Sequence, residues 1–365
     1  MKIILIVGTR PNFMKIAPIW QALIQHSDVF QPILVHTEQH YDDKMSQVFL
    51  KELKLPKPDY LLGVGSGSPA AQMAKIMASF EGVLLKEEPD MVLVVGDVTS
   101  TVACAMSAAL YNIPVAHVEA GLRSRDRSMP EEINRLMTDP ISDLLLTPSE
   151  DASENLRQEG IEEKRIHFVG NVMIDSLRLL ESRADTSPIL NGLGVTPGEY
   201  VFVTMHRASN VDDKNTLSGL LDALSQVQEY TRMVWPIHPR ARKMIEQFGL
   251  GDVLANMSNT KMVDPIGYID CLKLQKDAKF VLTDSGGLQE ETTAFGVPCL
   301  TMRENTERPV TIEQGTNTLV GISPKRIVVE ARAVVDGTYK TGCVPKLWDG
   351  KAAERIALVL KTYLS

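Results

Sequence analysis

The sequence predicts an α/β protein built from two Rossmann-like domains, each a parallel sheet covered by helices. Short apolar, β-branched runs alternate with helix-length amphipathic stretches along the 365-residue chain, which favours parallel sheets buried on both faces. These runs form two series of similar size, as expected for two α/β domains in tandem. The length leaves room for roughly two domains of about 150 residues each.

The elements follow from this pattern in order. Nine apolar runs are predicted to be strands, the first five in one domain and the last four in the other: Ile3–Val7, Gln31–His36, Met91–Val95, Val115–Val118, Leu144–Thr147, Val201–Met205, Met233–Ile237, Phe280–Thr283 and Pro298–Met302. We place the N-terminal domain at 1–170 and the C-terminal domain at 171–350. A helix is expected over 172–182, then a polar linker over 184–198. A last helix, within 351–365, is expected to pack back on the N-terminal domain.

Composition excludes several classes of protein. Lys plus Arg number 38 against 46 Asp plus Glu, a formal net charge of −8, so the chain lacks the basic footprint of a nucleic-acid binder. The four cysteines form no CxxC pair, which argues against a disulfide framework or a structural zinc site. No apolar run approaches the roughly 18 residues of a membrane span, and the short first run does not resemble a signal peptide. We therefore expect a cytoplasmic protein without membrane contact.

Polar residues gather directly after the predicted strands. In open parallel sheets ligands bind beyond the carboxyl ends of the strands, so these positions are the predicted site. The segments are Gly8-Thr9-Arg10-Pro11 with Lys15, Gly96-Asp97, Glu119-Ala120-Gly121, His206-Arg207, His238-Pro239 and Asp284-Ser285-Gly286-Gly287.

Ser285, Gly286 and Gly287 stand at a strand-to-helix junction. Small residues there leave backbone N–H groups open, and the helix start adds partial positive charge, so a diphosphate could bind. A plain tight turn would look the same. Arg10 and Arg308 could add charge-assisted bonds to the phosphates, although either arginine alone could equally form a surface salt bridge.

The phosphate motif belongs to neither of the two common nucleotide-binding types. The sequence has no GxxxxGK[ST] and no GxGxxG after its first strand, which disfavours nucleoside-triphosphate hydrolysis and nicotinamide chemistry. No metal-ligand spacing stands out either, because His36 and His40 lack the HExxH order. We expect neither a metal nor a cofactor.

Asp97, Glu119 and Glu131 form a second group of candidates. Several carboxylates at one site can serve as general acid, general base and orienting group. Alternatively, Asp97 and Glu131 could cap or begin helices, and for Glu132 that structural role is the better interpretation. His206 and His238 each follow a strand of the second series and are placed for substrate contact.

Seven motifs in this order resemble the non-hydrolysing UDP-N-acetylglucosamine 2-epimerases. They span residues 3 to about 321 and read Gly8-Thr9-Arg10-Pro11, Gly96-Asp97, His117-Val118-Glu119-Ala120-Gly121-Leu122-Arg123, Pro130-Glu131-Glu132-Ile133-Asn134-Arg135, His206-Arg207, Thr283-Asp284-Ser285-Gly286-Gly287-Leu288-Gln289-Glu290-Glu291 and Thr306-Glu307-Arg308-Pro309.

The resemblance implies a glycosyltransferase-B type fold with a UDP-sugar in an interdomain cleft, and usually a homodimer. It implies interconversion of UDP-N-acetylglucosamine and UDP-N-acetylmannosamine without NAD or metal, for surface polysaccharide synthesis. The residues that it would place around the sugar and its leaving group are Asp97, Glu119, Glu131 and His206. Those that it would place on the UDP moiety are Arg10, Lys15, Ile266, Ser285, Gly286, Gly287, Glu291 and Arg308.

The chain departs from the family members that a second UDP-N-acetylglucosamine activates. Of their regulatory residues it retains Gln39, Arg207 and His238, but it has Ala208 and the Gly/Ser-rich loop 63–68 where those members have arginines. The stretch from Gln39 to Asp43 is also seen in relatives acting on UDP-2,3-diacetamido-glucuronic acid. A C3-modified UDP-sugar therefore remains an alternative substrate, and a UDP-sugar glycosyltransferase an alternative activity.

Overall fold

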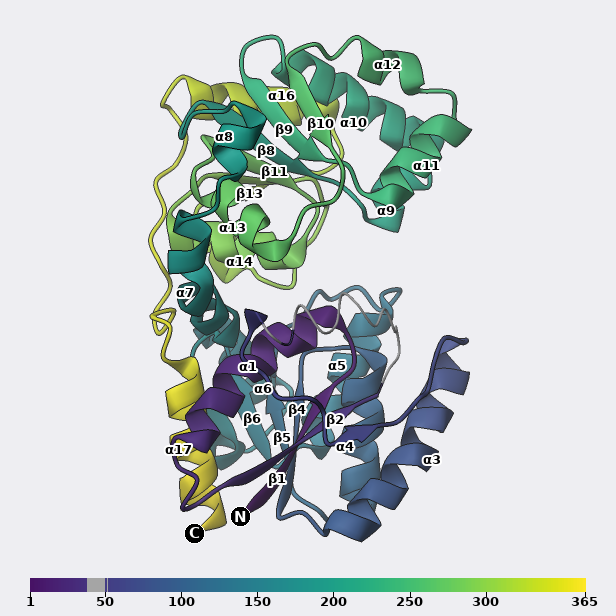
Figure 1. The fold of residues 1–365 in the computed structure, drawn as a ribbon, viewed down its shortest axis with the longest axis vertical. Coiled ribbons are helices and arrows are strands. Elements are labelled where there is room, and N and C mark those ends of the chain that lie inside the picture. The colour runs from purple at the N-terminus through teal and green to yellow at the C-terminus, as the bar shows by residue number, and fades with distance from the viewer. Residues whose placement is uncertain (38–49, 51) are drawn as a thin grey trace. The chain divides into compact units, whose positions relative to one another are not determined.

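The computed structural model describes residues 1–37, 50 and 52–365, with the Arg10 side chain left out. The chain divides into two compact units: unit 1 comprises Met1–Ser176 with Lys346–Ser365, and unit 2 comprises Leu177–Pro345 (Figure 1).

Within the described residues, unit 1 contains a seven-stranded parallel sheet of order β3-β2-β1-β4-β5-β6-β7. Its strands are β1 (Lys2–Val7), β2 (Gln31–His36), β3 (Tyr60–Leu61), β4 (Met91–Val95), β5 (Val115–Val118), β6 (Leu144–Thr147) and β7 (Ile166–Phe168). Its helices are α1 (Arg10–Ile24), α3 (Pro69–Glu87), α4 (Thr99–Leu110), α5 (Pro130–Ile141), α6 (Glu150–Gln158), the 3₁₀ turn η1 (Glu163–Arg165) and α17 (Ala352–Leu364). The helix α7 (Val172–Asp185) begins in unit 1 and continues into unit 2.

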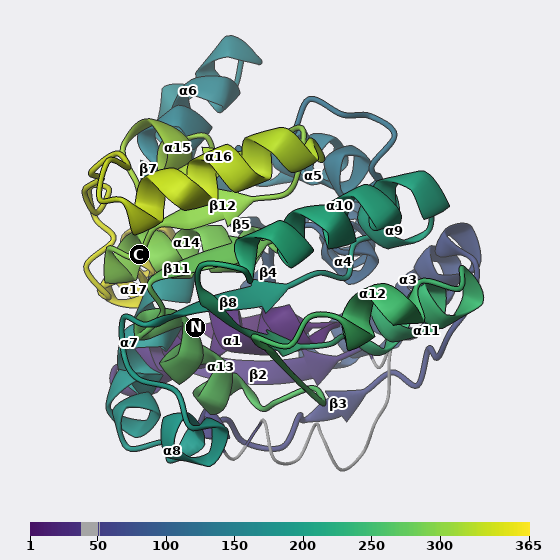
Figure 2. The same cartoon turned by 90° about the horizontal axis from the view of Figure 1, so that it is seen from above.

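Unit 2 repeats the arrangement with a parallel sheet of order β10-β9-β8-β11-β12-β13. Its strands are β8 (Tyr200–Thr204), β9 (Arg232–Pro236), β10 (Thr260–Val263), β11 (Phe280–Thr283), β12 (Cys299–Thr301) and β13 (Asn317–Leu319). Its helices are α8 (Ile189–Leu193), α9 (Ala208–Val211), α10 (Lys214–Val227), α11 (Pro239–Gln247), α12 (Gly251–Ala255), α13 (Tyr268–Lys276), α14 (Gly286–Phe295), α15 (Val310–Glu313) and α16 (Pro324–Val335). Figure 2 shows α10 and α16, which pack together, on one side of this unit.

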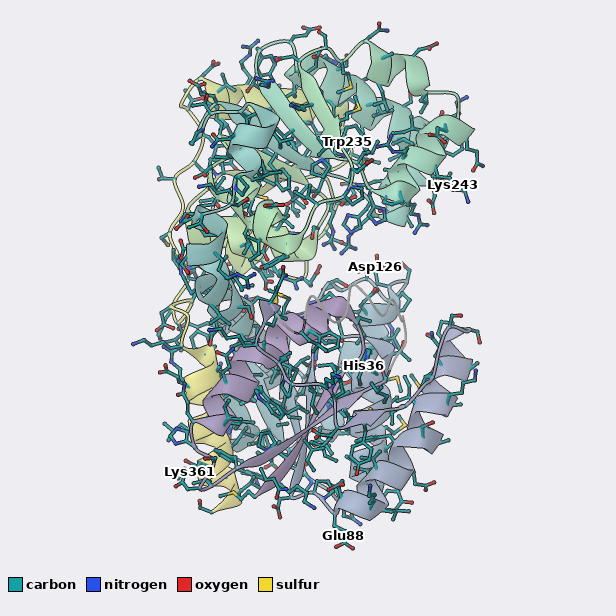
Figure 3. All side chains as sticks on the ribbon, in the orientation of Figure 1. His36, Glu88, Asp126, Trp235, Lys243 and Lys361 are labelled. Atoms are coloured by element: carbon teal, nitrogen blue, oxygen red, sulfur yellow. The ribbon has the colours of Figure 1, made fainter. Side chains whose placement is uncertain are left out.

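The cores explain why these runs become strands. The strands β1 and β4 are almost wholly buried, and their side chains join those of α3 and α4 in one apolar cluster. In unit 2 the equivalent cluster contains Trp235, whose indole is fully buried inside the unit (Figure 3). Continuous apolar strands of this kind are stable only with helices on both faces. The predicted α/β class with two parallel Rossmann-like sheets is confirmed.

The linker differs from the sequence-based prediction, whereas the last helix packs where it was expected. The expected linker over 184–198 contains the end of α7 and the short helix α8, whose Leu190 and Leu193 are buried in unit 2. The last helix, α17, lies against α1 in unit 1 (Figure 1), and Asp175 accepts hydrogen bonds from the Ala352 and Ala353 N–H groups at its start (3.1 and 2.7 Å). No helix in the described part of the chain has the length and apolarity to cross a bilayer.

Candidate functional site

In both sheets the strand order reverses at one point, between β1 and β4 in unit 1 and between β8 and β11 in unit 2. Helices leave opposite faces of the sheet at such a point, so the carboxyl ends of the two strands open a crevice. The segments after these four strands are Gly8–Thr9, Gly96–Asp97, His206–Arg207 and Asp284–Ser285. Most predicted site residues therefore lie at or beside a switch point.

Asn12 joins the two sides of the switch point in unit 1. Its Oδ1 accepts from the N–H groups of Thr9 (2.9 Å) and Gly8 (3.3 Å), and its Nδ2 donates to the Val95 carbonyl (3.1 Å). One buried amide thus caps α1 and ties the end of β1 to the end of β4. Sequence reasoning missed Asn12, although its place three residues after Thr9 is a capping-box position.

Lys15 and Glu119 form a buried ion pair beside this point. Lys15 is 7% and Glu119 4% exposed, and Nζ contacts Oε2 directly. Glu119 has φ +68°, and its Oε1 is buried without a hydrogen-bond partner among the described residues. A strained backbone and an unsatisfied buried oxygen are costly in a core, and both are features that proteins tolerate mainly at functional sites.

Asp97 is held from α5. Its Oδ2 accepts from Arg135 Nε (3.1 Å) and Nη2 (2.7 Å), and its backbone carbonyl accepts from Asn134 Nδ2 (2.8 Å). Its side chain is about a quarter exposed, at 26%. Arg135 and Asn134 therefore fix the position and orientation of Asp97.

Glu132 lies in the first turn of α5, as the sequence suggested, but its side chain binds residues outside that turn's backbone and does not cap the helix. It is buried, pairs with Arg135 Nη1, and accepts from the N–H groups of Ser124 and Arg125 (both 2.9 Å). Burial works against ionisation, but these hydrogen bonds and Arg135 outweigh it and lower the Glu132 pKa. Glu131, one residue earlier, is exposed in the first turn of α5, with no side-chain hydrogen bond or ion pair to any described residue.

In unit 2, the N-terminus of α14 is open. Ser285 is its N-cap, and no side chain of the described residues caps the first turn. A Cβ on Gly286 would lie 2.9 Å from both Arg308 Nη1 and Glu307 Oε1, whereas one on Gly287 would meet nothing within 4 Å. Uncapped N–H groups beside a guanidinium are the kind of groups that bind anions in proteins.

Two carboxylates flank Arg308 at this helix start. Nε lies 2.8 Å from Glu290 Oε1, and Nη1 pairs with Glu307. Glu307 also pairs with the buried Arg303 (2.9 Å). The residues 290, 303 and 307 were not among the predicted site residues, because which charges face Arg308 depends on the fold.

The rings of His206 and His238 lie close together, a pairing that the sequence analysis did not predict. Their ring centroids are 5.4 Å apart, and His206 Nδ1 lies 2.9 Å from Oδ1 of the buried Asp284. Although burial opposes ionisation, bonds from His206 and from the Arg207 N–H (2.8 Å) lower the Asp284 pKa. Through its contact with Nδ1, Asp284 fixes the orientation of the half-exposed His206 ring. Burial and the neighbouring His206 lower the His238 pKa.

Glu291 is buried in α14, five residues after Gly286, the first residue of that helix. Tyr268 Oη and Gln275 Nε2 each donate to its carboxylate at 2.6 Å. Burial, with a smaller contribution from Glu290, raises the Glu291 pKa to about 7. Ile266, also predicted to contact UDP, is half-buried just before α13 and packs on the second apolar cluster of unit 2.

Two predicted residues are not placed by the structure. Gln39 lies outside the described residues, and so does the side chain of Arg10. Among the described residues, no group of three or more His, Cys, Asp or Glu side chains could hold a metal ion.

The two parallel sheets, with polar residues after the strands at their switch points, define a class: α/β proteins with the glycosyltransferase-B type fold. A profile of the family described as UDP-N-acetylglucosamine 2-epimerase matches residues 22–361. The chain belongs to this family and is an epimerase.

Relatives and solved structures agree. The UDP-N-acetylglucosamine 2-epimerase of Methanocaldococcus jannaschii is 42% identical over 366 residues, 99% of each chain. The UDP-2,3-diacetamido-2,3-dideoxy-D-glucuronate 2-epimerase of Pseudomonas aeruginosa is 42% identical over 361 residues, 98% of each chain. The M. jannaschii enzyme in complex with UDP-GlcNAc and UDP superposes with a TM-score of 0.88 at 41% identity, covering 100% of both chains.

Proposed function

We propose that this protein interconverts UDP-N-acetylglucosamine and UDP-N-acetylmannosamine by eliminating UDP and adding it back. The support is the Lys15–Glu119 pair and Asp97 at one switch point, together with the open α14 N-terminus and Arg308 at the other. The M. jannaschii relative carries the name of this activity.

The chemistry of the sugar explains why both groups are needed. The C2 proton is weakly acidic because no carbonyl neighbours C2. Inversion without a redox step is easiest if a base takes that proton while the C1–O bond breaks and UDP leaves with the electron pair. The resulting C1=C2 glycal is then protonated at C2 on the opposite face, and UDP adds back at C1. Elimination therefore requires stabilisation of the departing diphosphate and acid/base groups on two faces of the ring.

The residues divide between these tasks. In unit 2, Ser285, Gly286, Gly287 and Arg308 bind the diphosphate, Glu291 the ribose and Ile266 the base. Arg10 and Lys15 of unit 1 add positive charge near the nucleotide. Asp97, Glu119, Glu131 and His206 act on the sugar and its leaving group. Arg207, His238 and Gln39 have secondary or regulatory roles.

Proton NMR of the purified protein with UDP-N-acetylglucosamine in D₂O tests the reaction. Deuterium should enter C2 as UDP-N-acetylmannosamine appears, without any added cofactor. Accumulation of UDP and free sugar would instead identify a hydrolysing enzyme, and the proposal would be wrong.

A C3-modified UDP-sugar is the second candidate, because the P. aeruginosa relative is as similar to this chain as the M. jannaschii enzyme. The same NMR experiment with UDP-2,3-diacetamido-glucuronic acid decides between them. The substrate with the higher kcat/KM is the physiological one.

We further propose a cytoplasmic homodimer that supplies precursors for surface polysaccharide and uses neither a metal nor a redox cofactor. Sedimentation velocity tests the dimer. Full activity after dialysis against a chelator tests independence from metal ions.

A further inference from the structure

A buried chain of alternating charges lies behind the carboxylates of unit 1. It begins at His117 on β5, whose Nδ1 lies 2.6 Å from Asp139 Oδ1. Asp139 Oδ2 lies 2.6 Å from Arg123 Nη2, and Arg123 donates to Glu159 through Nε (2.8 Å) and Nη2 (2.6 Å). His117 and Asp139 are completely buried. The order of formal charges is positive, negative, positive, negative once His117 is protonated.

The hydrogen bonds of His117 set its protonation state. Nε2 faces the Gly96 carbonyl at 2.8 Å, and a carbonyl oxygen can only accept. Nδ1 faces Asp139, whose other oxygen already receives Arg123 and the Gly121 N–H (3.2 Å). Although burial opposes its ionisation, His117 and Arg123 lower the Asp139 pKa, so this carboxyl group is a carboxylate. Each ring nitrogen therefore faces an acceptor oxygen, an arrangement that an imidazolium satisfies with both of its N–H groups.

The alternating order makes this buried charge tolerable. An isolated buried ion is expensive, but a fully hydrogen-bonded pair with further partners offsets much of the desolvation cost. Here Asp139 lies between two cations, and the outer cation reaches the partly exposed Glu159. The four charges of this side-chain network sum to zero. His117 can therefore remain charged without a counter-ion from solvent.

The target of His117 is the turn that carries Asp97. Gly96 has φ +69°, and β5 binds it twice: its N–H donates to the Val118 carbonyl (3.0 Å), and its carbonyl accepts from His117. Gly96 lies directly against the Lys15–Glu119 pair. A Cβ at this position would lie 2.9 Å from Lys15 Nζ and 3.2 Å from Glu119 Oε2. The position of Gly96 thus determines both the direction of Asp97 and the room left for the ion pair.

We propose that His117 is a positioning residue, a permanently protonated imidazolium that fixes the Gly96 turn and, through it, the reactive placement of Asp97 and of the Lys15–Glu119 pair. This inference rests on the proposed function, because it assigns these side chains to the acid/base chemistry. A core histidine with a packing role only would be neutral, and its loss would lower stability without selectively affecting turnover.

Nitrogen NMR of the full-length wild-type protein, labelled with ¹⁵N in its histidine rings, tests the protonation state without any activity assay. The His117 signals are those that move in the Asp139→Asn variant. Both ring nitrogens should carry protons across the pH range in which the enzyme is active. One unprotonated nitrogen at neutral pH would overturn the proposal.

Kinetics of two variants test the positioning role. His117→Gln removes the charge and cannot donate to both Gly96 and Asp139, so kcat should fall about 100-fold, as expected when a catalytic group moves by about 1 Å. KM for the UDP-sugar should stay within about threefold. In Asp139→Asn the amide can donate to Nδ1 and a neutral ring keeps its N–H on the Gly96 carbonyl, so kcat should fall less.

The matched control is His167→Gln, which changes a histidine on β7 that has no place in the site; its kcat should equal that of the wild type. An unchanged kcat in His117→Gln, or a larger loss in Asp139→Asn than in His117→Gln, would overturn the proposal. If His117→Gln does not fold, Asp139→Asn and the NMR experiment still decide it. If the wild-type protein epimerises no UDP-sugar, the proposed function fails, whereas the NMR result still reports on His117.

Discussion

Replacing Gly96 by alanine separates two effects that the structure assigns to this residue. The first is backbone strain: φ +69° lies in the left-handed region, where an L-residue costs about 1–2 kcal/mol. The second is crowding. The new Cβ would lie 2.9 Å from Lys15 Nζ and 3.2 Å from Glu119 Oε2, whereas ordinary contacts are 3.4–4 Å.

The crowding sets the size of the kinetic effect. Because the pair is buried, Lys15 cannot withdraw into solvent and must shift by about 0.5–1 Å within the site. A displacement of that size at reacting groups costs about 100-fold in rate. We therefore expect Gly96→Ala to lose about 1–2 kcal/mol in the free energy of unfolding, measured by urea denaturation, and about 100-fold in kcat, measured by NMR.

Gly65→Ala is the matched control. Gly65 belongs to the same unit and has nearly the same φ, +67°, but a Cβ there would meet nothing within 4 Å. It should lose a similar amount of stability and keep its kcat. Equal kcat in the two variants would refute the argument that Gly96 makes room for the Lys15–Glu119 pair.

Three further predictions concern the remaining site residues. Asp97→Asn and Glu131→Gln should each lower kcat by about 10²- to 10⁴-fold while UDP binding, followed by calorimetry, persists; near-normal turnover in both would contradict the acid/base assignment. Gly286→Ala should weaken UDP binding about tenfold or more, because the new Cβ displaces Arg308 and a charge-assisted hydrogen bond contributes about 1.5–3 kcal/mol; an unchanged Kd would contradict this. The Glu291 pKa is raised from 4.5 to about 7, so the folded state binds more protons than the unfolded state over that range, and stability falls as the pH rises through it. Between acidic and neutral pH, the wild type should lose up to about 3 kcal/mol more unfolding free energy than Glu291→Gln does. If urea denaturation shows the same loss in both proteins, the raised pKa of Glu291 is contradicted.

Hydrophobic patterning located nine strands because it is a local signal. Those runs all form strands, with ends that differ by at most one residue. The short strands β3, β7, β10 and β13 escaped prediction. They have two to four residues and lie toward the sheet edges, where partial exposure removes the continuous apolar signal.

The site was predictable to the same extent. Gly96, Asp97, Glu119 and Ser285 could be found because ligands bind where parallel strands end, and strand ends can be read from sequence. The partners of these residues could not. Arg135 reaches Asp97 from 38 residues away, and Asp284 reaches His206 from 78, and no local pattern records such pairings.

The sequence by itself determined the α/β class, the two-sheet plan and the polar residues at the strand ends, because burial periodicity and turn chemistry act over a few neighbouring residues. Only the tertiary structure decided which of those residues are buried or charged, and how they are oriented. Glu131 and Glu132 are adjacent, yet one is exposed and the other is buried with Arg135. His117 has an acceptor at each of its two nitrogens only because the fold brings Asp139 and the Gly96 carbonyl to them. Ionisation depends on desolvation and on the nearest charges, and both are fixed by contacts between segments far apart in the chain.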